Sequence, residues 1–206
     1  MSNHTISIIT ATLNRASLKD ACESVNNQTF QNWHHYVIGD GVRPIDYSHP
    51  HRTTIGFSRH IGASEPAADK PYGTPNPIWR WAIQHLNLGQ YVCFLDDDNI
   101  YRSKYLEVML NSLSSNPHAG IVLCALEDLR QDAIHDGYPE LGRCDTSAFL
   151  VSSKIIKEIG IPHEYPGRDA ISDYDFIRMC SAKYGWVRVE EKLVVFGFGL
   201  STIPEN

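Results

Sequence analysis

Short apolar runs alternate with amphipathic segments along the first 126 residues. The apolar runs are rich in β-branched residues and have the length of strands covered on both faces. We expect strands at residues 5–12, 33–39, 52–57, 91–95 and 119–126. Between them, apolar residues recur at helical spacing, as do Leu18, Ala21, Cys22 and Val25. This spacing predicts helices that begin at a capping-box-like Ser17, at an N-cap Asn76 and at Arg102.

The second half of the chain, from about residue 127, is less regular. We expect a strand at 145–152, helices at 154–159 and 172–184, and one or two strands at 186–196. The alternation of strands and helices in the first half predicts an α/β fold with a mostly parallel central sheet flanked by helices. No linker or repeat divides the sequence, so we expect one domain over 1–206.

Composition narrows the range of functions. The 206 residues carry 18 Lys and Arg against 24 Asp and Glu, a net charge of −6. This argues against a nucleic-acid binder, which needs a basic face, and predicts repulsion of phosphates unless a cation intervenes. The N-terminus lacks a signal-peptide pattern and no apolar run approaches the roughly 20 residues of a transmembrane segment, so we expect a cytoplasmic protein. Five cysteines without a CxxC pair are expected to be reduced.

The strongest chemical signal is the acidic triplet Asp96–Asp98, which directly follows the apolar run 91–95. Ligands of open α/β sheets bind at the carboxyl ends of strands. Carboxylates about 5 Å apart repel each other by about 3 kcal/mol at an effective dielectric constant of about 20, so three in a row favour a bound cation. Carboxylates and substrate phosphates together are the usual ligands of Mg²⁺ or Mn²⁺. The alternative is a solvated acidic turn in which Asp98 or Asn99 caps the next helix.

Two further aspartates lie where chemistry is expected. Asp40 follows the run 33–39, where it is either an acceptor for a nucleobase or ribose or part of a simple Asp40-Gly41 turn. Asp173 is a candidate general base for an alcohol or sugar hydroxyl. The same segment also has the pattern of a capping box, Ser172-x-x-Asp175, so a structural role at a helix start stays open.

Other familiar catalytic patterns are missing from the sequence. It contains no GxSxG, HExxH, Walker A or GxGxxG motif. The sequence therefore gives no support to a serine hydrolase, a zinc protease, a P-loop protein or a dinucleotide-binding protein. The histidine pairs His34-His35 and His49-Pro50-His51 have no evident third ligand, so we do not expect them to bind a metal.

Taken in order, the motifs resemble those of the family 2 glycosyltransferases, which have the GT-A fold. The resemblance rests on 7–15 (SIITATLNR), on 21–33 with its Gln28-Thr29-Phe30, on Asp40, and on 94–101 (FLDDDNIY). The last motif is most similar to that of the spore-coat polysaccharide transferases. The likeness is good over 5–116 and thin over 145–180, where Asp173 aligns with the late aspartate taken as the catalytic base.

The resemblance implies an inverting transfer of a sugar from a nucleoside diphosphate donor to an acceptor hydroxyl. Residues 1–116 would bind the donor and residues 117–206 the acceptor. Mn²⁺ or Mg²⁺ would be bound by Asp98 and Asp96 and would stabilise the leaving diphosphate, while Asp173 would deprotonate the acceptor. The residues implied in donor binding are Thr10, Ala11, Leu13, Arg15, Asp40, Arg80, Asp96 and Asp97. Trp79 and Trp81 either line the sugar site or belong to the core.

Departures from the family pattern leave the substrates open. Leu13 replaces an aromatic residue that stacks on uracil, Gly39 replaces the first acid of an Asp pair, and 196–199 lacks an extra histidine ligand. A UDP-sugar is the favoured donor, with GDP- and dTDP-sugars as alternatives. The expected acceptor is a saccharide or small hydroxyl compound. The short acceptor half suggests a small acceptor, a partner subunit or a minimal catalytic domain, and a homo-oligomer is one of the expected states.

Two other functions also remain as alternatives. A sugar-phosphate nucleotidyltransferase would normally carry a Gly-rich basic signature after the first strand, which 14–17 does not supply. A non-catalytic nucleotide- or sugar-binding module of the same fold is opposed by the intact Asp96–Asp98 and Asp173.

Overall fold

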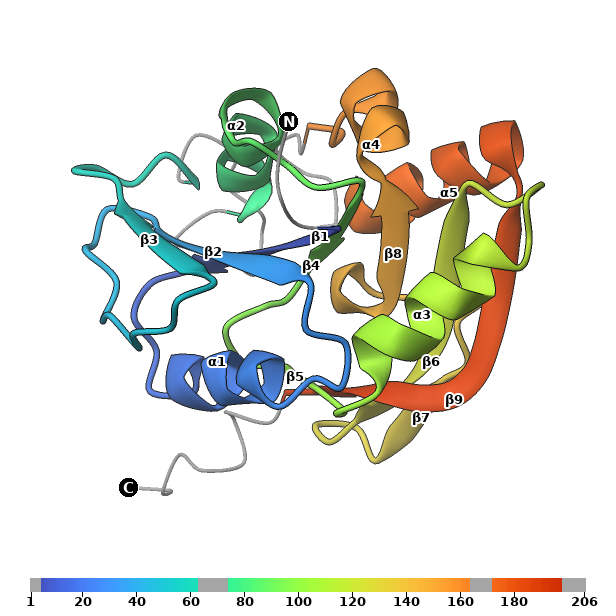
Figure 1. The fold of residues 1–206 in the computed structure, drawn as a ribbon, viewed down its shortest axis with the longest axis horizontal. Helices are drawn as coiled ribbons and strands as arrows, with labels where there is room; N and C mark the ends of the chain where they lie inside the picture. Colours follow the sequence, from blue (N-terminus) through green and yellow to red (C-terminus); the bar gives the residue numbers. More distant parts are fainter. Residues whose placement is uncertain (1–4, 63–73, 164–171, 198–206) are drawn as a thin grey trace.

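A nine-stranded sheet organises the computed structural model, which describes residues 5–62, 74–163 and 172–197 (Figure 1). Its strands are β1 (Ile6–Thr12), β2 (Trp33–Gly39), β3 (Arg52–Gly56), β4 (Tyr91–Phe94), β5 (Ile100–Tyr101), β6 (Ile121–Asp128), β7 (Ala133–His135), β8 (Phe149–Ser152) and β9 (Trp186–Phe196). The α-helices are α1 (Leu18–Asn26), α2 (Asn76–His85), α3 (Tyr105–Ser114), α4 (Ser153–Ile159) and α5 (Ser172–Tyr184).

Several strands of the sheet run in the same direction, so their carboxyl ends lie at the same end of the sheet. The order is β3-β2-β1-β4-β8-β6-β9-β5, with β7 paired to β6. Strands β3, β2, β1 and β4 are parallel, β8 runs antiparallel to β4 and to β6, and β9 runs parallel to β6. Strand β6 therefore runs in the same direction as β4, so the segments that follow β1, β2, β4 and β6 leave the sheet on the same side.

Helices cover both faces of the sheet, and α2 and α1 lie above and below the first strands in Figure 1. Successive side chains of a strand point to opposite faces, so the neighbours Ile8 and Ile9 of β1 belong to different apolar clusters. The cluster around Ile8 includes Met109 of α3, and the cluster around Ile9 includes Trp79 of α2. The apolar runs of the sequence are thus buried on both faces, as their composition predicts.

The predicted α/β pattern is confirmed in the first half, and the main differences lie further along the chain. The helix expected from Arg102 begins only at Tyr105, because residues 100–101 form β5 and pair with the distant β9. The strand expected over 145–152 is a 3₁₀ turn, Thr146–Ala148, followed by the shorter β8. Strand β7 was not expected from its three residues, and β9 is one strand whose register against β6 shifts near Ala125.

Helix α1 confirms the predicted apolar face but not the predicted cap. Its buried side chains are those of Leu18, Ala21, Cys22 and Val25. Ser17, however, has helical backbone angles and its side chain makes no capping hydrogen bond, so the expected capping box is wrong. Helix α2 starts one residue early, with Pro75 at the cap position in place of Asn76.

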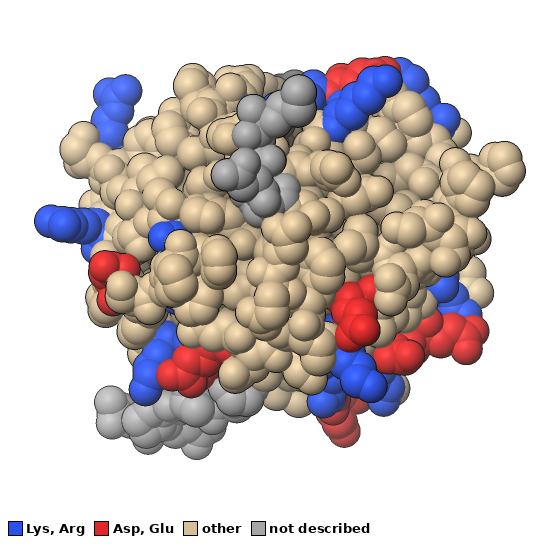
Figure 2. Space-filling model, in the orientation of Figure 1, with Lys and Arg blue, Asp and Glu red and all other residues tan. Residues whose placement is uncertain are grey.

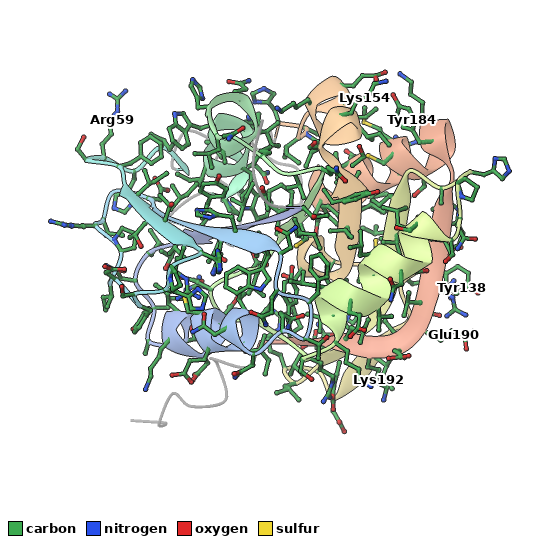
Figure 3. The ribbon with its side chains drawn as sticks, viewed as in Figure 1. Arg59, Tyr138, Lys154, Tyr184, Glu190 and Lys192 are labelled. Carbon is green, nitrogen blue, oxygen red and sulfur yellow. The ribbon has the colours of Figure 1, made fainter. Side chains whose placement is uncertain are left out.

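The surface carries charge of both signs. Figure 2 shows basic and acidic side chains mixed around the rim of one face. The labelled Arg59, beyond β3, and Lys192, on β9, project at opposite sides of the molecule (Figure 3). All five cysteines lie in the described part of the chain and are free. Among the described residues, no helix has the length and apolar character that crossing a membrane requires.

Candidate active site

The strand register brings the predicted aspartates together around the end of β1. Thr12 of β1 lies opposite Gly39 of β2, and the backbone N–H of Asp40 donates to the carbonyl oxygen of Thr12 at 2.9 Å. On the other side, the N–H of Leu95 donates to the carbonyl of Ile9 at 3.1 Å, which places Asp96–Asp98 beside the same strand end. Asp40 and the acidic triplet therefore flank β1, as the expected parallel sheet requires.

Asp97 is the buried member of the triplet. Its side chain is 6% exposed, and Oδ2 accepts a hydrogen bond of 2.6 Å from the hydroxyl of Thr12. Arg15 Nη1 lies 3.1 Å from Oδ1. Burial raises the pKa of the Asp97 carboxyl, whereas Arg15 and the hydrogen bonds from Thr12 and the Leu13 backbone oppose that rise. The fold thus holds a desolvated carboxylate at a strand end and supplies it with donors from the loop after β1.

Arg15 also contacts the next aspartate. Its Nη1 lies 3.0 Å from Asp98 Oδ2, and the Asp98 side chain is 17% exposed. The residue before it, Asn14, has a φ of 65°, a left-handed conformation that few residues other than glycine adopt readily. The side chain of Asn14 donates to the Arg43 carbonyl at 2.8 Å and accepts from the Ile45 N–H at 3.0 Å. These bonds fix the turn that directs Arg15 toward the aspartates.

Asn99 anchors the other end of the acidic turn. It is fully buried, its Nδ2 donates to Ser147 Oγ at 2.9 Å, and its Oδ1 accepts from the Gly197 N–H at 2.8 Å. The Asp96 N–H donates to the same Ser147 hydroxyl at 3.3 Å. Helix α3 starts at Tyr105 with Lys104 at its cap position, so the alternative in which Asp98 or Asn99 caps that helix is wrong.

The 3₁₀ turn links this loop to the predicted base. Thr146, next to Ser147, donates its hydroxyl to Asp173 Oδ2 at 3.3 Å. Asp173 Oδ1 also accepts from the Tyr174 N–H at 2.7 Å, in the first turn of α5. Asp175, in the same turn, lies 3.9 Å from Arg178 at Nε. A chain of contacts therefore joins Asp173 through Thr146 and Ser147 to the acidic turn, although the sequence separates them by about 75 residues.

Asp40 has a structural task at its strand end. It is 6% exposed, and its carboxylate accepts backbone hydrogen bonds from Ile61 at 2.6 Å and Gly62 at 3.0 Å. Gly41 has a φ of 72°, and a Cβ atom there would lie 2.7 Å from the ring of His60. The chain therefore bends at Asp40-Gly41, as the turn alternative predicts, and the contact of Asp40 with a base or ribose stays a prediction. A surface hollow lies beside it, lined by Gly41, Val42, Arg43, Gly56, Phe57 and Ser58.

The other predicted donor-binding residues have diverse surroundings. Thr10 is fully buried with its hydroxyl 2.9 Å from His35 Nε2, while Ala11 and Leu13 are half-buried. Arg80 donates to the backbone carbonyl of Pro162 at 3.1 Å. Trp79 belongs to the core, where its ring packs against Phe94 at 4.7 Å between centroids, and Trp81 contacts Phe57 and His85.

The acidic turn offers a partial set of oxygen ligands for a hard divalent cation. Asp96 and Asp98 are partly exposed oxygen donors, and a cationic nitrogen already lies against Asp98. Across the described residues, no three His, Cys, Asp or Glu side chains converge to enclose a metal ion. Mg²⁺ and Mn²⁺ suit such a partial set, because one or two carboxylates bind them while substrate phosphates and water complete the shell.

Sequence reasoning missed the groups whose hydrogen bonds hold the site together: the side chains of Thr12, Asn14, Thr146 and Ser147 and the backbone N–H of Gly197. Each belongs to a residue that is common in a turn or at a strand end, so the residue type alone carries no signal. The position of Thr12 at the end of a predicted buried strand could have indicated a side chain near the acidic triplet.

Comparisons with known proteins identify the fold. No family model matches the chain, and none of the curated protein sequences matches it. Among solved structures, S. aureus TarS 1-349 superposes with a TM-score of 0.66 at 12% identity, covering 93% of this chain and 60% of its own. The complex of TarS 1-349 with UDP-GlcNAc has a TM-score of 0.64 at 14% identity, covering 97% and 61%. The mannosyltransferase PcManGT from Pyrobaculum calidifontis, in complex with GDP-Man and Mn²⁺, has a TM-score of 0.65 at 14% identity, covering 96% and 58%.

These likenesses show that the chain has the GT-A fold of the glycosyltransferases, which confirms the expected fold class. The chain spans about 60% of the length of these neighbours.

Proposed function

We propose that this protein is a metal-dependent, inverting glycosyltransferase of the family 2 type, similar to the spore-coat polysaccharide transferases, with residues 1–116 binding the donor and 117–206 the acceptor. The observation that carries the proposal is the contact chain at the sheet edge. It joins Thr12 and Arg15 to Asp97, and the acidic turn through Ser147 and Thr146 to Asp173. A buried carboxylate, a partly exposed carboxylate and a candidate base are thus held within one polar network.

The donor is a nucleoside diphosphate sugar. In this proposal Asp97 and Arg15 bind the ribose and diphosphate region. Asp40, whose carboxylate also accepts from the backbone N–H groups of Ile61 and Gly62, contacts the base next to the hollow that begins at Gly41. UDP is the favoured nucleotide, with GDP and dTDP as alternatives. Neighbours of the same fold were solved with UDP-GlcNAc and with GDP-Man, which supports a sugar nucleotide but leaves the base to experiment.

The reaction breaks the bond between the anomeric carbon and the diphosphate oxygen. The acceptor oxygen attacks the anomeric carbon from the opposite side, and Asp173 takes the proton of that hydroxyl. Thr146 orients the Asp173 carboxylate through its 3.3 Å hydrogen bond. A divalent ion held by Asp98 and Asp96 would neutralise the charge that develops on the leaving diphosphate. Burial of Asp97 and Asn99 keeps the turn rigid, which favours a fixed position of the donor.

Thermal unfolding with a panel of UDP-, GDP- and dTDP-sugars, each with and without Mn²⁺, tests the proposal. A ligand that binds only the folded state raises Tm, so the correct nucleotide should raise it only when Mn²⁺ is present. Asp98→Ala should abolish that rise. Glu127→Ala is the matched control, because it removes a carboxylate near the end of β6 that pairs with Arg102.

Transfer activity separates an enzyme from a binding module. Asp173→Asn should keep metal-dependent donor binding and lose about 10²- to 10⁴-fold in transfer, the usual contribution of a general base. If Asp175→Asn has this effect and Asp173→Asn does not, the base is Asp175. Donor binding without turnover in the wild type would indicate a binding module, and release of diphosphate from a sugar phosphate and a nucleoside triphosphate would indicate a nucleotidyltransferase.

A further inference from the structure

Arg15 lies where a divalent cation would have to compete with it. A single nitrogen, Nη1, lies 3.1 Å from Asp97 Oδ1 and 3.0 Å from Asp98 Oδ2. The Arg15 side chain is 52% exposed, whereas those of Asp97 and Asp98 are 6% and 17% exposed. The carboxylates are therefore largely buried by the fold, whereas the cation between them belongs to a half-exposed side chain.

Asp97 and Arg15 also differ in how firmly the neighbouring residues hold their side chains. Asp97 is fixed independently of Arg15, since the Thr12 hydroxyl donates to it at 2.6 Å. The loop that carries Arg15 is tied at Asn14, whose N–H donates to Thr12 Oγ1 at 2.9 Å. Only the long side chain of Arg15 lies beyond these ties. It can leave the carboxylates without any change in the backbone of the acidic turn.

We infer that Arg15 is an exchangeable counter-ion, which neutralises Asp97 and Asp98 in the donor-free protein and moves to the diphosphate when the donor and its divalent ion bind together. The inference rests on the proposed function and adds to it, because Arg15 changes partner from the aspartates to the diphosphate and does not stay on one of them throughout. Asp97 and Asp98 would otherwise stand as adjacent uncompensated charges before the donor arrives.

The exchange predicts a specific thermodynamic signature. In the absence of the donor, a divalent ion must displace Arg15 and therefore binds weakly. Once the diphosphate offers Arg15 another partner, that penalty disappears, so donor and ion strengthen each other's binding. Linkage requires the same factor whichever ligand is added first. If Arg15 stayed fixed, it would oppose the ion equally with and without the donor, and this coupling factor would not depend on Arg15.

The experiment measures Mn²⁺ binding by electron paramagnetic resonance of the free ion, with and without the nucleoside diphosphate that most stabilises the wild type. Arg15→Gln should bind Mn²⁺ alone about 3- to 10-fold more tightly than the wild type, the range expected for loss of one partly exposed charge contact. It should also bind the nucleotide less tightly at saturating Mn²⁺. The coupling factor between the two ligands should fall by about 10-fold.

Arg102→Gln is the matched control, because Arg102 is 51% exposed and pairs with one carboxylate, that of Glu127. It should change the coupling factor by less than about twofold. Arg15→Lys retains the charge without the planar guanidinium and should give an intermediate factor, which keeps the test valid if Arg15→Gln folds poorly.

A coupling factor unchanged in Arg15→Gln, or changed equally in Arg102→Gln, overturns the exchange while leaving the proposed function intact. A wild type that binds neither Mn²⁺ nor any nucleoside diphosphate overturns both proposals.

Discussion

Two buried aspartates lie at the carboxyl ends of strands that run in the same direction, and they have opposite kinds of surroundings. Asp97 follows β4, and its contacts come from Thr12 and Arg15, more than 80 positions away in the sequence. Asp128 ends β6 with a fully buried side chain. Its carboxylate accepts from the N–H of Arg130 at 2.9 Å and from Arg130 Nε at 3.2 Å, and His135 Nε2 lies 3.5 Å away.

The difference distinguishes a candidate binding residue, Asp97, from a residue that stabilises the fold, Asp128. All the partners of Asp128 named above belong to its own β6–β7 hairpin, and the Arg130 guanidinium also stacks on the Phe196 ring at 3.7 Å. These contacts lie within the hairpin and stabilise it. The cationic partner of Asp97 comes from a half-exposed side chain on another loop, and burial raises the pKa of the Asp97 carboxyl. A carboxylate whose pKa is perturbed by burial and whose cationic partner is half-exposed is the more typical functional group.

Donor binding should separate the two residues most sharply. Asp97→Asn should weaken binding of the nucleoside diphosphate with Mn²⁺ by about 100-fold, which corresponds to about 2.7 kcal/mol and is the range for losing a charged hydrogen-bonding partner. Asp128→Asn should change it by less than about threefold. Isothermal titration calorimetry at one fixed salt concentration measures both. Equal losses in the two variants would contradict the assignment of Asp97 to the site and Asp128 to the framework.

Stability should change in the opposite way. Asp128→Asn replaces a buried acceptor by an amide that faces the donors of Arg130 and His135, so it should lower the free energy of unfolding by about 2 kcal/mol. For a chain of this size, that is a fall in Tm of about 4 to 8 °C. Calorimetry or circular dichroism of the ligand-free protein measures the change. Arg130→Gln, which removes the facing charge, should destabilise less than additively when combined with it. Full additivity would show that the two side chains do not act together.

The sequence predicted those parts of the molecule that local pattern determines. The apolar face of α1, the full extent of α5 and the position of Asp96–Asp98 after β4 all follow from periodicity or from a buried run that ends abruptly. The ends of α3 and β8 did not follow, since they depend on pairing between β5 and β9 and on the 3₁₀ turn before β8. Such pairings join segments far apart in the chain, and no local spacing encodes them.

The candidate site likewise contains residues that local sequence pattern reveals and residues that only long-range contacts bring together. Its charged members stand out in the sequence because charge next to a buried strand is costly and therefore informative. Its connecting members, such as Thr12, Asn99 and Ser147, act through hydrogen bonds whose partners lie in other elements. The pattern of the sequence located the aspartates and the resemblance added Arg15 and Arg80, but only the folded chain reveals that Ser147 and Thr146 connect the acidic turn to Asp173.

The smallest expected effect concerns pH. Because burial raises the pKa of Asp97 above its ordinary value of 3.8, the folded protein binds this proton more tightly than the unfolded chain does. The contribution of Asp97 to stability is therefore greatest in acid and is lost as the pH rises through the folded-state pKa. Asp97→Asn, which has no charge to desolvate, should exceed the wild type in Tm by about 2 °C near neutral pH.

That advantage should shrink as the pH falls through the folded-state pKa and should be smallest below the ordinary value of 3.8, where the carboxyl is protonated in both the folded and the unfolded chain. Melting curves of both proteins at several pH values, without ligand or metal, measure the difference. An advantage that grows in acid would mean that the charge of Asp97 stabilises the fold through Arg15, as an ordinary structural ion pair does. Asp97 would then belong with Asp128, and the contrast between the two strand ends would be one of position alone.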